Sequence, residues 1–272
     1  REKKKNKNKT KVIIQLFHAG RLTVQKISKG KSLAPSSINT FNQPSFWRPR
    51  VRNNIVHFQT NTRFKRPKKI SLDKANVIIK QFEKSCDYAM KAGFDGVEIH
   101  GAHGYLVHTF NTLETNKRSD KFKAKNYRFS IELVKRCKKV IKNKILSYRL
   151  SLHMVDNTFI KYSNNDYNIS KLIKKLDSHG VNVFHCSELK AGSGLFEGNK
   201  SLVEIVRNVT KKTIISCGAI LEDDQINRIF KLGGNLLAFG RTSMVYPDLV
   251  LRYKKSQKFN KKFTYDKWKK YY

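Results

Sequence analysis

The segment GFDGVEIHGAHGYL, residues 93–106, decides the fold of this chain. Residues 96–100 form a short run with the composition of a buried strand. The strand ends in a dense polar cluster, because His100, His103 and Tyr105 fall within six residues. Polar side chains gathered at the end of a buried strand are typical of α/β proteins, which place their sites at the carboxyl edge of a parallel sheet.

Extended and helical patterns alternate on both sides of this segment. Short apolar runs that predict buried strands lie at residues 12–17, 96–100, 144–150, 181–186, 213–217 and 235–239. Amphipathic stretches that predict helices lie at residues 72–92, 130–142, 169–179, 202–209 and 222–232, and a last helix is expected to start near Pro247. This alternation predicts a parallel sheet covered by helices, in the α/β class.

Two architectures fit this alternation: a doubly wound sheet and a TIM-type (β/α)8 barrel. No Gly-x-Gly-x-x-Gly sequence follows the first strand, which weakens the doubly wound alternative. Polar residues follow nearly every predicted strand, as expected if the strands meet at one mouth. We therefore predict a single barrel domain over residues 1–272, with six strands visible. Residues 22–70 are irregular and hold four of the five prolines, which indicates a long loop or lid, and residues 255–272 form a basic C-terminal tail.

The charge of the chain is unusual, since 57 Lys and Arg against 20 Asp and Glu give a net charge of +37. Such an excess is typical of proteins that bind nucleic acid or an anionic surface. After the first eleven residues, however, the lysines are dispersed over predicted helices, where they would face solvent. No RNA- or DNA-binding motif is present, so a basic nucleic-acid-binding protein is the least favoured alternative and we expect no specific nucleic-acid partner.

The cysteines and the apolar runs predict the environment of the protein. Cys86, Cys137, Cys186 and Cys217 stand far apart, whereas zinc and iron–sulfur sites need clustered thiolates, so we expect no metal and four buried, reduced thiols. No apolar run approaches the roughly 20 residues of a membrane-spanning helix, and no secretory signal is visible. We therefore predict a cytoplasmic protein without a membrane partner, and a homo-oligomer stays open.

The ends of the last two predicted strands could hold a phosphate group. Gly218 follows one strand, and Gly240 and Arg241 follow the next. Glycine lets backbone N–H groups approach a phosphate closely, and an arginine adds a bidentate charged contact. Ordinary turn glycines with a surface arginine are the alternative. Barrel proteins commonly bind a phosphate at these two loops, so the sequence supports a phosphate site and ordinary turn glycines about equally.

The cluster formed by His100, His103 and Tyr105 could hold a carbonyl oxygen and deliver a proton. Histidines three residues apart can also bind a metal ion, but no third ligand is evident in the sequence. The density of imidazole and phenol groups favours a catalytic site over a structural one.

Residues 93–106, together with residues 116–120 (NKRSD), resemble the signature of the Old Yellow Enzyme family of FMN-dependent NAD(P)H:flavin oxidoreductases, or ene-reductases. Further motifs similar to those of the family lie at residues 15–21, 34–36, 147–151, 216–220 and 237–241. The resemblance implies an eight-stranded TIM barrel, of which this chain would begin at the third strand. It departs from the family pattern after Asp120, where a Gly-Gly-Ser segment is expected and Lys121 to Lys125 stand instead.

The resemblance also implies residues for a flavin cofactor. Gln15 would hydrogen-bond the pyrimidine edge of the flavin, and Arg149 would stabilise negative charge on it. Gly218, Gly240 and Arg241 would hold the FMN phosphate.

By the same resemblance, His100 and His103 would bind the oxygen of the substrate's electron-withdrawing group, and Tyr105 would donate a proton. NADH or NADPH would reduce FMN, and hydride would then pass to an activated alkene or carbonyl substrate of the enone type. The alternative is a non-catalytic or fragmentary remnant of the family, motivated by the expected loss of two strands and the altered segment after Asp120.

Overall fold

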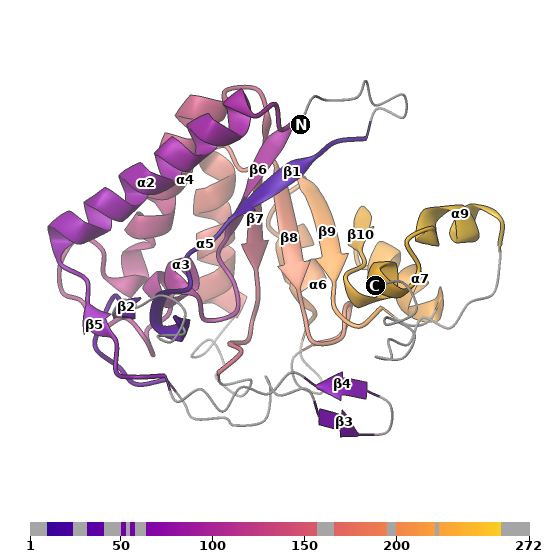
Figure 1. Cartoon of the computed structure of the whole chain (residues 1–272), viewed down its shortest axis with the longest axis horizontal. Coiled ribbons are helices and arrows are strands. Elements are labelled where there is room, and N and C mark those ends of the chain that lie inside the picture. The colour runs from indigo at the N-terminus through magenta and orange to yellow at the C-terminus, as the bar shows by residue number, and fades with distance from the viewer. Residues whose placement is uncertain are drawn as a thin grey trace.

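The computed structural model describes residues 10–23, 32–40, 50–52, 55–57, 64–156, 166–194, 200–220 and 223–256. Within them, one six-stranded parallel sheet forms the centre of the molecule, in the order β1-β6-β7-β8-β9-β10 (Figure 1). Its strands are β1 (Ile13–Leu16), β6 (Gly96–His100), β7 (Ile145–Leu150), β8 (Val183–Ser187), β9 (Thr213–Cys217) and β10 (Leu236–Ala238). All six predicted strands are confirmed.

The register of the sheet is staggered in the manner of a barrel wall. Gly96 of β6 pairs with Ile145 at the start of β7, but Val183 at the start of β8 pairs with Ser147, two residues into β7. The same offset recurs where Leu236, the first residue of β10, pairs with Ile215 of β9. Accumulated stagger of this kind tilts the strands and curls a parallel sheet into a barrel.

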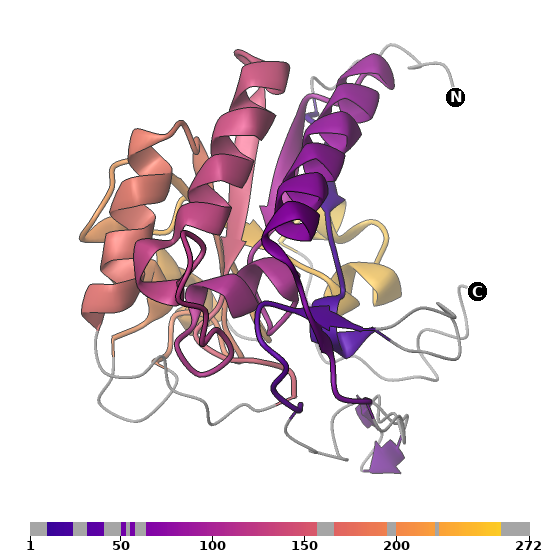
Figure 2. The same ribbon diagram turned by 90° about the vertical axis from the view of Figure 1, so that its left-hand side faces the viewer.

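Helices cover one face of this sheet. Figure 2 shows α2 and α4 running side by side along it, and their side chains pack against one another. The helices are α2 (Leu72–Lys91), α3 (Leu106–Asn111), α4 (Arg128–Ile141), α5 (Asp166–Ser178), α6 (Leu202–Arg207), α7 (Asp223–Lys231), α8 (Arg241–Val245) and α9 (Leu249–Lys254), with 3-10 turns at η1 (Gly20–Leu22) and η2 (Ala124–Asn126). The predicted helices are all present, whereas α3 and α8 were not predicted.

The alternation of side chains along β6 separates the core from the site. Val97 and Ile99 are fully buried in the apolar core, which they share with residues of α2 and α4. Within that core the rings of Phe110 and Phe129 stack at 3.8 Å. Glu98, whose side chain points to the opposite face because successive residues of a strand alternate, lies against polar residues of the neighbouring strands. The helix-covered face is therefore apolar and the other face is polar.

The longest helix begins where the sequence predicts. Ser71 has an extended backbone, and its hydroxyl accepts a hydrogen bond from Lys74 N at 3.1 Å, which satisfies one of the free N–H groups of the first turn of α2. Ile78, Phe82 and Cys86 of α2 recur at helical spacing and are buried in the core, whereas Leu72 and Val77 are exposed.

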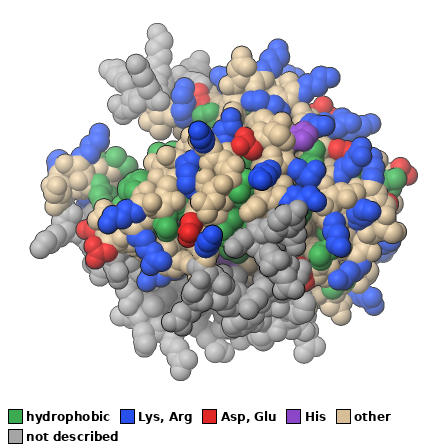
Figure 3. Space-filling model, turned by 180° about the vertical axis from the view of Figure 1, so that it is seen from behind, with side chains coloured by type: hydrophobic (Ala, Val, Ile, Leu, Met, Phe, Trp, Pro, Cys, Tyr) green, Lys and Arg blue, Asp and Glu red, His purple; other side chains and the backbone are tan. Residues whose placement is uncertain are grey.

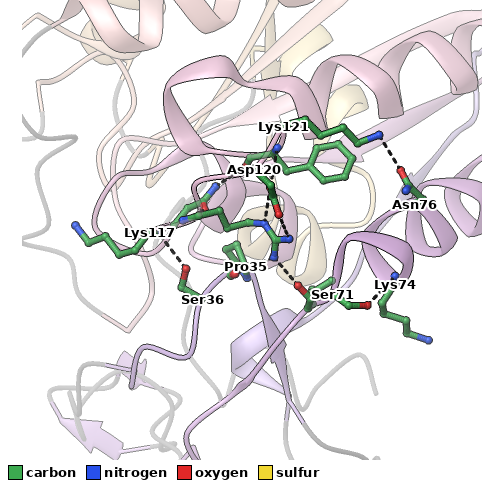
Figure 4. Close-up of polar contacts among 12 residues, drawn as sticks. Pro35, Ser36, Ser71, Lys74, Asn76, Lys117, Asp120 and Lys121 are labelled. Atoms are coloured by element: carbon green, nitrogen blue, oxygen red, sulfur yellow. Dashed lines mark hydrogen bonds and ion pairs between the residues drawn. The ribbon is translucent and has the colours of Figure 1, made fainter.

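Arg118 joins the region before α2 to the segment that follows α3. Its guanidinium is buried, pairs with Asp120 and donates to Pro35 O at 3.1 Å, while Ser36 Oγ accepts a hydrogen bond from Lys117 N at 2.9 Å (Figure 4). Arg118 Nη1 also donates to the carbonyl of Ile70. The motif at residues 116–120 therefore holds the chain at Pro35, Ser36 and Ile70 in place through hydrogen bonds.

Short strands lie within residues 22–70. β2 (Leu33–Ala34) pairs in parallel with β5 (Lys68–Lys69), and β3 (Arg50–Arg52) forms an antiparallel hairpin with β4 (Ile55–His57). Much of this predicted lid, and nearly all of the predicted tail at residues 255–272, lies outside the described residues, so both stay predictions.

The surface and the cysteines can be compared with the expectations from composition. Lys and Arg side chains are scattered over the face in Figure 3, interspersed with uncharged groups and a few acidic ones. All four cysteines are buried and carry free thiols, as predicted. None of the described helices combines the length and the apolar run that crossing a bilayer requires.

Candidate active site

A buried carboxylate, Glu98, lies at the centre of the polar face of the sheet. Gln15 Nε2 donates to its Oε1 at 2.6 Å, and Ser147 Oγ donates to its Oε2 at 2.6 Å. His185 Nδ1 lies 3.0 Å from Oε2. Burial opposes ionisation, but the contacts with His185, Ser147 and Gln15 outweigh it and lower the pKa of Glu98 to about 2. One ionised carboxylate therefore joins side chains from β1, β7 and β8.

His185 completes this group as a cation. Burial alone would lower the pKa of its imidazole, but hydrogen bonding and charge at Cys217 and Glu98 raise it to about 9. The same cation, together with Arg149, lowers the pKa of the Cys217 thiol against the effect of burial. The polar face thus carries fixed positive charge at neutral pH.

Ser187 links two candidate residues farther along this face. Arg149 Nη2 donates to Ser187 Oγ at 3.1 Å and contacts Cys217 Sγ at 3.4 Å. His103 Nε2 lies 2.8 Å from the same hydroxyl oxygen. Arg149 and His103 therefore contact the same side chain, although 46 residues separate them in the sequence.

The backbone of His103 is in the left-handed region, with φ of +62°. This conformation costs a residue other than glycine roughly 1–2 kcal/mol. Two hydrogen bonds hold it: His103 N donates to Ser151 Oγ at 2.8 Å, and His103 O accepts from Val155 N at 3.1 Å. A strained histidine fixed by two loop contacts is typical of a functional position.

Aromatic rings surround His100. Its ring centroid lies 5.1 Å from that of Tyr105, 5.2 Å from that of His103 and 5.6 Å from that of Phe17. Phe17 also packs edge-to-face on Tyr105 at 4.6 Å, yet 51% of its surface is exposed. An exposed aromatic ring beside two imidazoles and a phenol offers a flat apolar ligand a surface to pack against.

The protonation states of these groups follow from burial. Burial and the charge of Arg149 lower the pKa of His100 to about 4, and burial with the charge of His153 lowers the pKa of His103 well below its ordinary value. Burial raises the pKa of the Tyr105 phenol. At neutral pH the cluster therefore contains two neutral imidazoles and a protonated phenol, which suit hydrogen bonding to a neutral oxygen and proton donation.

A close backbone approach positions Tyr105. Gly20 has φ of +62°, and a Cβ at Gly20 would lie 2.9 Å from the backbone of Leu106. His18 O accepts a hydrogen bond from Leu106 N at 3.1 Å, directly after Tyr105. The loop that follows β1 therefore holds the start of α3, and only glycine leaves enough room at position 20.

The predicted phosphate residues lie at the ends of β9 and β10. At Gly218, φ is +139° and a Cβ would lie 2.0 Å from Glu188 O, so packing on β8 already requires glycine there. A Cβ at Gly240 would meet no atom within 4 Å, and both Gly240 and Arg241 are exposed. Open space and an exposed guanidinium fit an anionic group at the end of β10.

Two loops beyond the carboxyl ends of the strands complete the site. Arg21 and Asp156 form an ion pair at 2.6 Å with both side chains buried, and this pair ties the loop after β1 to the loop after β7. Between the latter loop and the loop after β8 lies a cavity of about 250 Å³. It is lined by Leu152, His153, Glu188, Leu189, Lys190, Ser193 and Gly194.

The polar face fits a flat heterocyclic cofactor with hydrogen-bonding edges. Buried nitrogen atoms on two adjacent strands have no hydrogen-bond partner among the described residues: His100 Nδ1 on β6 and Arg149 Nε on β7. Buried polar groups are normally paired, so two such atoms on paired residues of neighbouring strands indicate a polar ligand. Among the described residues no group of three or more His, Cys, Asp or Glu is arranged to hold a metal ion.

The structure brings together most of the residues that the sequence singles out. Gln15, His100, His103, Tyr105 and Arg149 share the polar face and its carboxyl edge, and the roles predicted for them stay predictions. Gly218, Gly240 and Arg241 lie at the ends of the next two strands.

Sequence reasoning missed several residues that this face contains: Phe17, Glu98, Ser147, His185 and Cys217. A signal was present for two of them. Glu98 and His185 are ionisable residues in the middle of otherwise apolar strands, where a charged side chain needs a partner.

A parallel barrel wall with a polar face, neutral imidazoles and a phenol at its carboxyl edge is typical of barrel proteins whose sites lie at the carboxyl ends of the strands. Comparison with known proteins gives the family. The sequence model described as "NADH:flavin oxidoreductase / NADH oxidase family" matches residues 3–260, and the chain belongs to this family. Its resemblance to Old Yellow Enzyme is thereby confirmed.

Curated relatives agree with this assignment. The chain is 29% identical over 257 residues to 12-oxophytodienoate reductase 2 of Arabidopsis thaliana, covering 91% of this chain and 65% of that protein. It is 26% identical over 257 residues to an NADH oxidase of Thermoanaerobacter brockii, covering 88% of this chain and 35% of that protein. The chain therefore spans about a third of one relative's length and two thirds of the other's.

Solved structures confirm the fold. The Old Yellow Enzyme homologue from Zymomonas mobilis matches with a TM-score of 0.78 at 22% identity, over 95% of this chain and 70% of that one. The Old Yellow Enzyme from Trypanosoma cruzi matches with a TM-score of 0.75 at 23% identity, over 92% of this chain and 68% of that one. The six-stranded sheet is thus the wall of a TIM-type barrel.

Proposed function

We propose that this chain binds FMN on the polar face of its sheet and acts as an NAD(P)H-dependent oxidoreductase on activated alkenes of the enone type. The observation that carries the proposal is the pair of unpartnered nitrogens, from His100 and Arg149, on adjacent strands of a chain in this family. The names of the relatives, including a 12-oxophytodienoate reductase and an NADH:acrylate oxidoreductase of Vibrio harveyi, support the substrate class.

Gln15 and Arg149 would hold the flavin ring, and the open space at Gly240 beside Arg241 would take the phosphate. The exposed amide of Gln15 can pair with a heterocycle that has both donor and acceptor positions. Arg149, with Nη2 on Ser187 and Nε free of partners, supplies fixed positive charge for a cofactor that becomes more negative on reduction. When bound, FMN supplies the two-electron chemistry between the nicotinamide and the alkene.

His100 and His103 would hold the carbonyl oxygen of the substrate. Both imidazoles are neutral at neutral pH, so a ring N–H of each can donate a hydrogen bond to an oxygen that gains charge during the reaction. The contact between His103 Nε2 and Ser187 Oγ, together with the backbone contacts of His103, fixes its ring without any substrate. This preorganisation favours the charged transition state over the ground state.

Tyr105 would deliver the proton to the α-carbon of the alkene. Burial raises the pKa of its phenol, so the group stays protonated at neutral pH until the carbon becomes basic. Phe17 packs edge-to-face on this ring and restricts its orientation. The exposed face of Phe17 offers an apolar surface beside the reacting carbons.

The test is FMN binding followed by turnover of the purified chain. We expect a flavin absorption band that survives desalting, bleaching of that band by NADH or NADPH without oxygen, and its recovery with 2-cyclohexenone. Cyclohexene, which lacks the electron-withdrawing carbonyl, is the matched control and should leave the band bleached. A chain that folds but binds no FMN would support the non-catalytic alternative and overturn this proposal.

A further inference from the structure

The side-chain amide of Gln15 is exposed on the polar face but is held from below by Glu98. The distance from Gln15 Nε2 to Glu98 Oε1 is 2.6 Å, which is short for an N–H···O bond and typical of a charged acceptor. An ionised carboxylate has no proton to donate, so only the NH2 end of the amide can face it. The carbonyl oxygen of Gln15 must then face away from Glu98.

We propose that Glu98 is a positioning residue, which fixes the orientation of the Gln15 amide so that Gln15 Oε1 is presented as an acceptor to an N–H group at the pyrimidine edge of the flavin. This inference rests on the proposed function, because it concerns how Gln15 recognises the FMN that the chain is proposed to bind. It assigns a role to a carboxylate that itself lies beneath the amide and is 8% exposed.

The surroundings of Glu98 keep it an acceptor. Ser147 Oγ on β7 donates to Oε2 at 2.6 Å, and His185 Nδ1 on β8 lies 3.0 Å from Oε2 and 3.2 Å from Oε1, so both carboxylate oxygens have a donor in addition to Gln15. Nearby charges are those of His185 and Arg149, while His100 on β6 is neutral and Cys217 on β9 faces His185. Positive charge therefore surrounds the carboxylate, and protonation is disfavoured over the ordinary pH range.

Without this carboxylate, both orientations of the Gln15 amide would be available. A glutamine at position 98 has one acceptor and one donor end, so it can pair with either end of Gln15. The side chain would then divide its time between two orientations, one of which would turn an NH2 group toward the N–H group of the ligand. The structure thus predicts a loss of affinity through Gln15 rather than through direct contact with Glu98.

The experiment measures the FMN dissociation constant of the purified chain by quenching of flavin fluorescence. We expect Glu98→Gln to weaken FMN binding about tenfold, the loss typical of one charge-assisted hydrogen bond. Glu83→Gln is the matched control, since Glu83 pairs with Arg136 on the helix-covered surface and should leave the constant unchanged. In a Gln15→Ala background, Glu98→Gln should cause no further loss, because its effect passes through the amide.

Equal losses from Glu98→Gln in the wild-type and Gln15→Ala backgrounds would overturn the inference, because Glu98 would then act independently of Gln15. If wild-type protein binds FMN but Glu98→Gln binds it equally well, the inference fails and the proposed function stands. If the wild-type chain binds no FMN, both fail.

A second measurement does not depend on whether a variant at position 98 folds. In the ligand-free wild-type chain, the side-chain amide of Gln15, assigned by its disappearance in Gln15→Ala, should show one proton that exchanges slowly with water. Fast exchange of both protons would contradict an amide anchored on a carboxylate and would overturn the inference.

Discussion

Removing the charge of Asp156 should destabilise the protein strongly. The side chains of Arg21 and Asp156 are 0% and 3% exposed and lie 2.6 Å apart. In Asp156→Asn the guanidinium would stay buried, facing the Met154 sulfur at 3.3 Å, and its Nε and Nη1 already have no hydrogen-bond partner in the structure. Breaking a buried ion pair in this way costs about 3–5 kcal/mol. That is a large share of the roughly 5–15 kcal/mol that stabilises a typical domain.

The same change should loosen the candidate site. Asp156 follows Val155, whose N–H donates to His103 O, and the ring of His153 lies 5.1 Å from that of His103. If the loop after β7 moves, the left-handed backbone of His103 loses one of the two hydrogen bonds that hold it. We therefore expect weaker binding of a carbonyl ligand at temperatures where Asp156→Asn is still folded.

The assay is urea unfolding of the chain followed by far-ultraviolet circular dichroism. Asp156→Asn should lower the midpoint with little change in the slope. Asp87→Asn breaks an exposed ion pair with Lys91 on α2 and is the matched control, for which we expect no measurable shift. The double variant Arg21→Met with Asp156→Leu removes both charges and should recover much of the stability that the single variant loses.

A loss below about 1 kcal/mol in Asp156→Asn, as found for surface pairs, would refute the reasoning. So would a double variant that is less stable than the single one, because the cost would then come from packing and not from an uncompensated charge.

Three further predictions follow from the site. Tyr105→Phe should leave reduction of bound flavin by NADH intact but slow reoxidation by an enone about 10²–10⁴-fold in stopped-flow absorbance, and equal rates would exclude Tyr105 as the proton donor. Gly218→Ala should lower the thermal midpoint markedly, since the new Cβ would lie 2.0 Å from Glu188 O; an unchanged melting curve would contradict that contact. Acidification should destabilise the fold, because the pKa values of His100 and His153 are about 4 in the folded chain against 6.5 unfolded, so the unfolded chain binds more protons between these values. Unfolding free energies from denaturant melts should fall by about 3 kcal/mol for each of these histidines from pH 6.5 to pH 4, and constant stability would contradict their neutral burial.

Much of the architecture follows from local patterns in the sequence. The six strands and the helix at Leu72–Lys91 were predicted within a few residues, because apolar periodicity and the Ser71 cap are short-range signals. The helix α3 was missed, since its six residues are all buried and show no amphipathic pattern. A short helix that is buried on every side and mixes apolar with polar residues shows no periodic contrast, so periodicity alone cannot distinguish it from a loop.

The candidate site likewise contains residues that the sequence identifies and contacts that only the structure shows. The sequence places His100, His103 and Tyr105 together because they are neighbours in the chain, and Gln15 and Arg149 were found through motifs that resemble those of a family. It does not show that Glu98 holds Gln15, since 83 residues separate the two positions. That contact depends on the pairing of β1 with β6 in the register that sets Gln15 opposite Glu98.

The sequence by itself therefore determined the six strands of the central sheet, the longer helices, their order and the residues at the ends of the strands. Only the tertiary structure decided which side chains meet across strands, that Arg21 is a buried partner of Asp156 rather than a loop arginine, and that Glu98 and His185 are both charged. The physical reason is that hydrophobic periodicity and capping act over a few residues, whereas register, burial and pKa depend on neighbours that strand pairing and packing bring from distant parts of the chain.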